Sequence, residues 1–148
     1  MLDVLEQDEG AAVLLVDPSG TMVLPIFVGG TEALTIKLRL DGEHYPRPLT
    51  HDLLLSLVKE LGGRAVKVQV DELRGDTFLG SVFVETGGRV LQLDARPSDA
   101  IAMALGSRVP IFVSRSVMLA AGVRRAELDR DPGADALGKH KRGNPISL

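Results

Sequence analysis

The sequence predicts a compact α+β domain with a largely antiparallel sheet and helices packed on it. Three observations support this class. A hairpin signal opens the chain, three strand-like runs follow one another between positions 64 and 94, and helical patterns are interspersed among them without regular alternation. The length of 148 residues, with 45% hydrophobic and 25% charged residues, suits one domain with a real core and excludes a mainly disordered chain.

A β-hairpin is expected near the N-terminus. The apolar run Ala12–Asp17 ends in Asp17-Pro18-Ser19-Gly20, and a second run, Met22–Val28, follows at once. Proline presets φ and glycine accepts a positive φ, so this tetrapeptide favours a tight turn. Pro25 has no N–H to donate, which predicts that the second strand lies at an edge or carries a bulge there.

The next segment, from Ala33 to Leu40, fits two periods. Its apolar residues alternate as in a strand, and they also recur at helical spacing. We favour a helix, because Gly29-Gly30 before Thr31 and the acidic Glu32 form a helix start signal with Thr31 as the capping residue.

A second helix is expected from an apolar stripe that stops at Gly62-Gly63; its members are Leu53, Leu54, Leu57, Val58 and Leu61. We expect Leu53, Leu57 and Leu61 to be buried against a meander of strands between positions 64 and 94. A short helix with a small-residue face follows Ser98, and then come a strand at Pro110–Val113 and a last helix at Arg115–Ala121.

The domain is expected to span residues 1–122, with a flexible tail at 123–148. The tail mixes charges with glycine and proline and shows helical character only around Arg124–Leu128.

Composition excludes several classes of protein. The chain has no cysteine, which removes disulfides, thiolate metal sites and cysteine nucleophiles. It has no apolar run of about 18 residues, as a membrane helix needs, and its acidic start lacks a secretory signal, so a cytoplasmic location is expected. The first 123 residues carry eleven Lys/Arg and sixteen Asp/Glu, and the chain has five Phe and Tyr in all. Net charge and aromatic content therefore give nucleic-acid binding no support.

Two segments resemble each other: Arg47-Pro48-Leu49-Thr50-His51-Asp52 and Arg96-Pro97-Ser98-Asp99. Each places Arg-Pro before a hydroxyl residue, an aspartate and an apolar helix, so each is predicted to start a helix, with the hydroxyl as cap and the aspartate against the positive dipole end. One interpretation is structural: two well-capped helices whose arginines pair with nearby aspartates. The other is functional, since an arginine beside a helix N-terminus suits an anion, and nearby aspartate and histidine suit a divalent ion or the activation of water.

Together these segments resemble the bifunctional nuclease domain family. The resemblance runs from about Ala12 to Gly122 and rests on Leu24-Pro25-Ile26-Phe27-Val28-Gly29 with Glu32-Ala33, the segment from Arg47 to Leu53, Asp76-Thr77-Phe78, and the segment from Asp94 to Ala102. It implies an α+β domain that tends to form homo-oligomers, a helix over Thr31–Leu40, and a nuclease that acts on DNA and RNA.

The resemblance leads to a hypothesis for the site. A metal-assisted phosphodiesterase would use Asp52, Asp99 and Glu32 to hold Mg²⁺ or Mn²⁺, with His51 activating water. Arg47 and Arg96 would then hold the scissile phosphate. The alternative is a non-catalytic module that binds an anion, a phosphorylated ligand or a partner protein. The two interpretations differ in whether the two Arg-Pro segments share one cleft.

Overall fold

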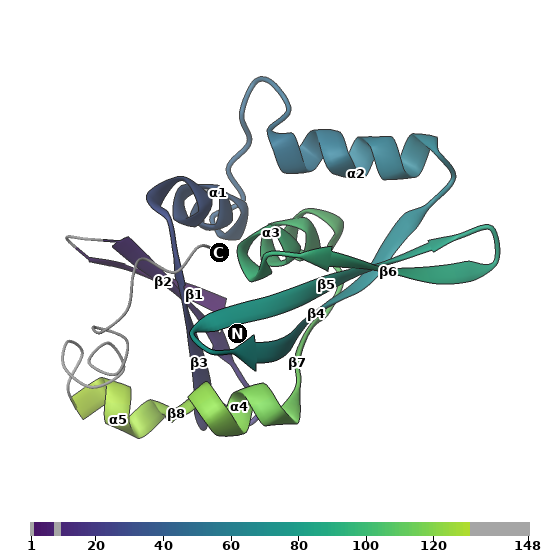
Figure 1. Cartoon of the computed structure of the whole chain (residues 1–148). Helices are drawn as coiled ribbons and strands as arrows, with labels where there is room; N and C mark the ends of the chain where they lie inside the picture. Colours follow the sequence, from purple (N-terminus) through teal and green to yellow (C-terminus); the bar gives the residue numbers. More distant parts are fainter. Residues whose placement is uncertain (1, 8–9, 131–148) are drawn as a thin grey trace.

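The computed structural model of the chain describes residues 2–7 and 10–130. Within these residues the strands form two four-stranded sheets, ordered β1-β2-β3-β8 and β6-β5-β4-β7, with helices between and around them (Figure 1). The elements in chain order are β1 Leu2–Gln7, β2 Gly10–Val16, β3 Met22–Val28, α1 Gly30–Leu40, α2 Thr50–Glu60, β4 Arg64–Arg74, β5 Thr77–Thr86, β6 Arg89–Ala95, α3 Pro97–Ser107, β7 Ile111–Val113, α4 Arg115–Ala121, β8 Val123–Arg124 and α5 Arg125–Arg130. This is the α+β class that the sequence predicts, with mostly antiparallel pairing.

The first sheet contains the expected hairpin of β2 and β3. The Asp17 carboxylate stabilises its turn by accepting hydrogen bonds from the backbone N–H of Thr21 at 2.9 Å and of Met22 at 3.1 Å. Beyond β3, the short β8 pairs only with Met22 and Val23, so the Pro25 position faces no strand on that side, as the edge prediction requires. The strand β1, which pairs along β2, is not among the elements that the sequence predicts.

The second sheet is the predicted meander with one addition. β4, β5 and β6 pair in antiparallel order, and β7 joins β4 in parallel at the opposite edge. α3 packs on this sheet through buried small residues, including Ala100, Ala102 and Ala104. The small side chains let the helix approach the strands closely, and the N-terminus of α3 follows directly from β6.

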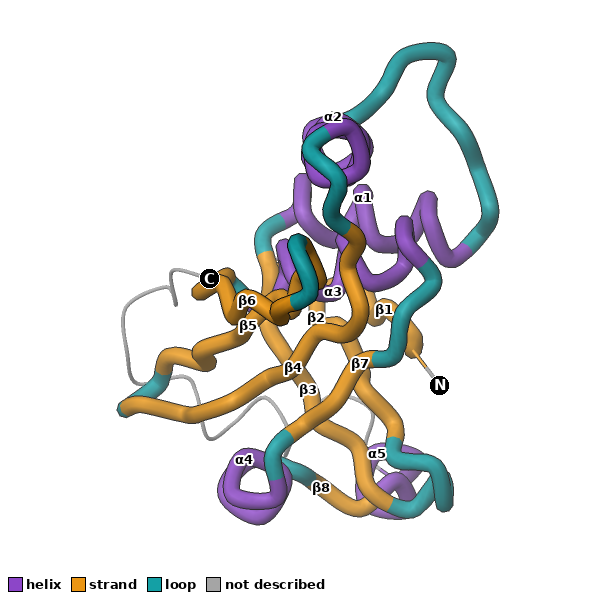
Figure 2. Tube along the Cα trace, turned by 90° about the vertical axis from the view of Figure 1, so that its right-hand side faces the viewer, coloured by secondary structure: helices purple, strands orange, loops and turns teal. Residues whose placement is uncertain are grey.

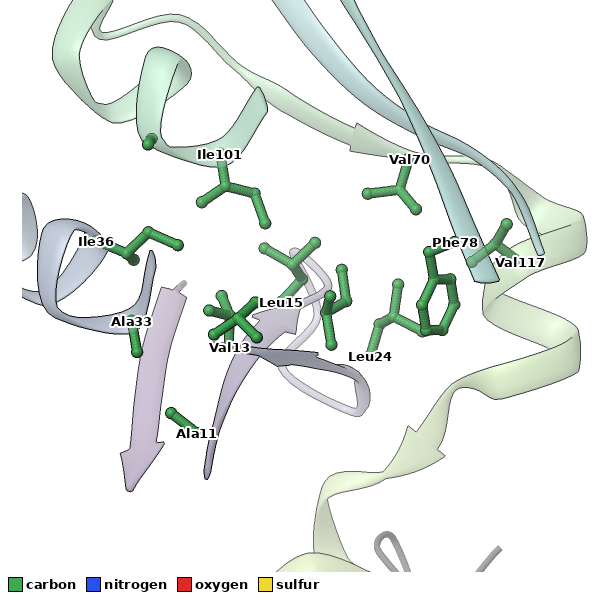
Figure 3. Packing of buried hydrophobic residues seen from close by; sticks show 13 residues of the cluster. Ala11, Val13, Leu15, Leu24, Ala33, Ile36, Val70, Phe78, Ile101 and Val117 are labelled. Atoms are coloured by element: carbon green, nitrogen blue, oxygen red, sulfur yellow. The ribbon is translucent and has the colours of Figure 1, made fainter. Parts of the chain in front are cut away.

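The main core lies where the two sheets and the inner helices meet. Figure 3 shows Ile36 from α1 and Ile101 from α3 extending toward Val13 and Leu15 of the first sheet, with Phe78 farther along the same cluster. Ile36 and Ile101 are fully buried. These contacts fix α1 and α3 relative to both sheets, and therefore fix the N-terminal ends of both helices.

The segment with two competing periods is a helix, as predicted, but its start differs in detail. The N-cap is Gly29, with no side-chain cap, and Thr31 lies inside the first turn. The same correction applies to the two Arg-Pro segments. Their N-caps are Leu49 and Arg96, so Thr50 and Ser98 do not cap their helices. The Ser98 hydroxyl is buried without a hydrogen-bond partner in the described part of the chain.

The prediction for α2 is right about the helix and wrong about its buried face. Leu53, Leu57 and Leu61 are 65%, 53% and 73% exposed, and α2 has no fully buried residue. Only Leu55 and Val58 pack against the second core cluster. The physical reason is that α3 already covers the sheet. α2 therefore lies outside α3 and contacts the rest of the protein through a narrow strip of its surface (Figures 1 and 2).

Ordered structure continues past residue 122. β8 pairs with β3, and α5 covers Arg125–Arg130, close to the short helical stretch expected there. The remainder of the predicted tail, residues 131–148, lies outside the described residues. Among the described residues, no helix is long and apolar enough to cross a membrane.

A helix side chain buried in the core and one exposed on α2 should contribute different amounts to the free energy of unfolding. Ile36→Ala removes a fully buried side chain and should lower the free energy of unfolding by about 2–5 kcal/mol. Leu57→Ala removes a half-exposed one and should change it by about 0.5 kcal/mol or less in the monomer. Urea unfolding at low protein concentration measures both. Equal losses for the two variants would contradict this placement of α2.

Candidate active site

The first turns of α2 and α3 meet in space. His51 Nε2 lies 3.1 Å from Asp99 Oδ1, although the two residues are 48 positions apart. The His51 side chain is 14% exposed and that of Asp99 is 30% exposed, so the pair is partly shielded from water. The two Arg-Pro segments of the sequence therefore do contribute side chains to one place.

Arg96 completes the cluster by bridging two carboxylates. Its Nε donates to Asp99 Oδ2 at 2.7 Å, and its Nη2 donates to Asp99 Oδ1 at 3.0 Å. Its Nη1 donates to Glu32 Oε1 at 3.2 Å, which brings in the first turn of α1. Gly29 leaves the room for this arrangement, because a Cβ there would collide with Glu32 Oε2.

The charged groups in the cluster shift one another's pKa values. The hydrogen bond from Arg96 lowers the pKa of Asp99, and the contact with His51 acts in the same direction, while partial burial opposes both. The same bond to Asp99 raises the pKa of Arg96, with Glu32 adding to the effect. Asp99 is thus held as a carboxylate, and Arg96 as a cation.

The contact between Asp99 and His51 also determines which ring nitrogen of a neutral His51 carries the proton. A carboxylate accepts hydrogen bonds, so the proton of a neutral His51 sits on Nε2, and Nδ1 carries the lone pair. A histidine whose ring is oriented by a carboxylate is the arrangement that general-base catalysis uses.

These residues lie in a cleft of about 680 Å³. One part of its lining is polar and includes Glu32, His51, Arg96 and Asp99 together with Thr31, Thr35, Thr50 and Asp94. The other part is apolar and comes from α2, the second sheet and α3: Leu54, Val58, Val82, Val84, Leu93 and Met103. A ligand with a polar group and an apolar body matches this division. The apolar wall could not be predicted from sequence pattern, because its residues come from four separate elements.

Asp52 and Arg47 do not join this cluster. Asp52 Oδ1 accepts from Arg39 Nη2 at 2.6 Å, and Oδ2 accepts from the backbone N–H of Leu49 at 2.8 Å. Burial raises the pKa of Asp52, but the bonds from Leu49 and Arg39 outweigh it and lower the pKa overall. Both Asp52 and Arg47 line a second pocket on the other side of the first turn of α2. Successive helical residues point about 100° apart, which is why His51 and Asp52 face different pockets.

The carboxylates suggested as metal ligands do not form a ligand set for a divalent ion. Asp52 faces Arg39, and both Asp99 and Glu32 face Arg96. Among the side chains that the structure describes, no group of three or more from His, Cys, Asp or Glu is arranged to hold a metal ion. Each of these three carboxylates already has an arginine as its partner: Arg39 for Asp52, and Arg96 for both Asp99 and Glu32.

Comparison with known proteins gives the family context. A family model described as the bifunctional nuclease domain matches residues 13–126. An uncharacterized protein of Mycobacterium tuberculosis is 38% identical over 120 residues, which cover 80% of this chain and 71% of that protein. Bifunctional nuclease 1 of Oryza sativa subsp. japonica is 26% identical over 117 residues, and bifunctional nuclease 1 of Arabidopsis thaliana is 24% identical over 120 residues. The matches cover 77% and 79% of this chain but only 35% and 37% of the two plant proteins.

The lowered pKa values of Asp52 and Asp99 predict how stability depends on pH. In the unfolded chain each titrates near the ordinary value of 3.8, and in the folded protein each titrates lower. Their contribution is therefore complete above about pH 5 and is lost as pH falls through 3.8 toward the folded values. The double variant Asp52→Asn/Asp99→Asn should show a flatter fall of Tm between pH 5 and pH 2 in thermal unfolding.

The matched control for this experiment is Asp129→Asn, which changes an exposed aspartate in α5. The Tm of this control should fall between pH 5 and pH 2 in the same way as that of the wild-type protein. Parallel plots of Tm against pH for the wild type, the double variant and the control would show that the ion pairs of Asp52 and Asp99 do not contribute to stability in acid.

Proposed function

The chain belongs to the bifunctional nuclease domain family, and on this premise we propose that it hydrolyses phosphodiester bonds in DNA and RNA. One observation carries the proposal: the oriented pair His51–Asp99 lies beside the half-exposed guanidinium of Arg96 in a single cleft. A base and a phosphate-binding cation side by side are what hydrolysis of a phosphodiester requires.

In the proposed mechanism, His51 acts as the general base. Its Nδ1 takes a proton from water as the water oxygen attacks phosphorus, and Asp99 stabilises the imidazolium that forms. The bond from phosphorus to the leaving sugar oxygen breaks, and that oxygen takes a proton from solvent. His51 then returns its proton to solvent, which restores the base. The Arg96 side chain is 46% exposed, so its guanidinium can face the phosphate while the two carboxylates hold it in place. The positive charge of the guanidinium stabilises the negative charge that develops on the phosphate oxygens.

Water as the nucleophile explains why one site would act on both nucleic acids. A mechanism that used the ribose 2′-hydroxyl would be confined to RNA, whereas attack by water needs no group on the sugar. The apolar wall of the cleft also supports action on both DNA and RNA. Its Leu54 and Leu93 can contact any base and read no hydrogen-bond pattern.

The ligand set expected for Mg²⁺ or Mn²⁺ does not fit this arrangement, and the mechanism contains no step through a metal ion. The second function considered, a non-catalytic module that binds an anionic ligand or a partner, uses the same ion pairs only to hold the helices. It predicts that the cluster matters for stability and not for turnover.

We also propose that the protein works in the cytoplasm as a homo-oligomer, with a second copy covering the exposed stripe Leu53, Leu57 and Leu61. Residues spaced by four repeat along one line of the helix, and two such stripes can pack antiparallel around a two-fold axis with opposed dipoles. In that case Leu57→Ala should lower the free energy of unfolding in urea only slightly in dilute solution and by more as the protein concentration rises.

Substitutions in the cluster separate the two functions. Asp99→Asn should reduce cleavage of both DNA and RNA by about 10²–10⁴-fold, because asparagine cannot stabilise the imidazolium. Arg96→Lys should also impair turnover, since an ammonium does not reproduce the planar donor array. Steady-state cleavage of labelled oligonucleotides by highly purified protein measures both, with Asp129→Asn as the control that keeps full activity. No cleavage by the purified wild-type protein, together with a Tm lowered by a few degrees in Asp99→Asn, would favour the non-catalytic module. Undiminished cleavage by Asp99→Asn would show that this cluster does not carry the catalysis.

The absence of a metal step gives a second prediction. Because His51, Asp99 and Arg96 are complete as placed, activity should persist after dialysis against a chelator and should change less than about twofold on addition of Mg²⁺ or Mn²⁺. Loss of activity in chelator and its recovery with either ion would contradict the mechanism. It would mean that an ion displaces Arg96 from Glu32 and Asp99.

A further inference from the structure

The second pocket lies on the other side of the first turn of α2 from the candidate active site. Its volume is about 450 Å³, and it is enclosed by the end of α1, the long loop between α1 and α2, and the end of α3. Figure 2 shows this loop as a wide arc that stands out from the helices. Nothing in the proposed mechanism uses this pocket.

The pocket gathers three arginines: Arg39, Arg47 and Arg108. The Arg39 side chain is 13% exposed and is anchored to Asp52, while its Nε is buried without an acceptor among the described residues. The chain also leaves space for this guanidinium: a Cβ at Gly106 would collide with Arg39 Nη1 and would lie 2.8 Å from Leu55 Cδ1. Arg39 is thus a partly buried cation, fixed in place, with donors that the protein does not use.

Arg47 and Arg108 are different, because both are exposed. In residues 2–7 and 10–130 neither makes a hydrogen bond or an ion pair with a carboxylate. Arg108 caps the end of α3 with φ of 57°, a left-handed conformation that no other non-glycine residue of the described part adopts. Apart from Asp52, which is bound to Arg39, the one carboxylate that lines the pocket is Glu43. The cations therefore outnumber the anions here, in a domain that is acidic as a whole.

An aromatic ring lies beside these arginines. Tyr45, the single tyrosine of the chain, is 51% exposed in the same loop and lines the pocket. Exposed aromatic rings next to basic side chains are the combination by which proteins hold single-stranded nucleic acids, with bases stacked on rings and phosphates on cations. A nucleotide unit supplies both groups at once.

The pocket adjoins the candidate active-site cleft at the N-terminus of α2. Leu49 lines both hollows, and the next turn presents His51 to one side and Asp52 to the other. A strand whose scissile phosphate lies at Arg96 can therefore pass over the N-terminus of α2 and place a neighbouring nucleotide in the second pocket.

We propose that this pocket is a second binding subsite for the nucleic-acid strand, with Arg47 and Arg108 on a phosphodiester outside the scissile position and Tyr45 stacked on the adjoining base. This inference rests on the proposed nuclease function, because the strand that it binds is the substrate of the first cleft.

The test compares a long substrate with a short one. In the variant Arg47→Ala/Arg108→Ala, the KM for a single-stranded 20-mer should rise about tenfold, because two phosphate contacts are lost. The kcat for the 20-mer and the cleavage of a dinucleotide should stay within about twofold of wild type, since the dinucleotide does not reach the second pocket. Arg89→Ala, which changes an exposed arginine at the start of β6, is the matched control and should leave the cleavage of both substrates unchanged.

Binding gives a readout that does not depend on cleavage. Fluorescence anisotropy with a nuclease-resistant phosphorothioate 20-mer should give a plot of log affinity against log salt that is less steep by about 1.4 in the double variant, the value for two lost contacts on a single strand. Tyr45→Ala should weaken binding, and Tyr45→Phe should restore it, because the ring and not the hydroxyl stacks.

Three outcomes would overturn the inference: equal KM values for the wild type and the double variant, an unchanged salt slope, or adenosine monophosphate displacing the 20-mer only from the wild-type protein at micromolar concentration. The last would identify the pocket as a site for a free nucleotide. A wild-type protein that binds the 20-mer through Arg47 and Arg108 but cleaves neither substrate would instead contradict the proposed nuclease function and leave the subsite standing.

Discussion

The ion-paired cluster around Arg96 is the constraint on which the geometry of the cleft depends. It joins the first turns of three helices, because Arg96 at the N-cap of α3 holds Glu32 of α1 and Asp99 of α3, and Asp99 holds His51 of α2. α1 and α3 are also fixed by the core, but α2 has no fully buried residue. Its direction is set by two partly buried side chains and by the polar contacts of its first turn. The same bonds that orient the candidate base therefore also hold the helix that carries it.

The first turn of α2 divides His51 and Asp52 between two hollows. His51 faces the cleft and Asp52 faces Arg39, so one turn places the candidate base on one side and anchors a cation on the other. The Asp52 carboxylate also accepts from the backbone N–H of Leu49, which ends the long loop in a defined place. A change at Asp52 is thus expected to act on the cleft only through the position of the helix.

The sequence predicts the parts of this fold that depend on local pattern. The hairpin turn at Asp17, the meander and the existence of α1, α2 and α3 all follow from periodicity and from turn or start signals. Which face of α2 is buried does not, because periodicity shows that a stripe exists and not what lies opposite it, and Leu57 faces solvent here. Motif spacing likewise suggested that Asp52 and Asp99 act together, whereas Arg39, which lies outside both motifs, holds Asp52 apart.

Net charge was the strongest objection to a polyanionic substrate, and the structure shows why it is a weak one. Several acidic side chains are already used by the fold: Asp17 closes its turn, Glu85 pairs with Arg64, and Glu72 pairs with Arg74. At physiological salt, unpaired surface charges act over about 8 Å, so a phosphate responds to the groups that line its pocket more than to the sum over the domain. In the second pocket those groups are Arg39, Arg47 and Arg108 against two carboxylates, whereas the first cleft holds Arg96 beside three carboxylates. The excess of positive charge therefore lies in the second pocket, although the domain as a whole is acidic.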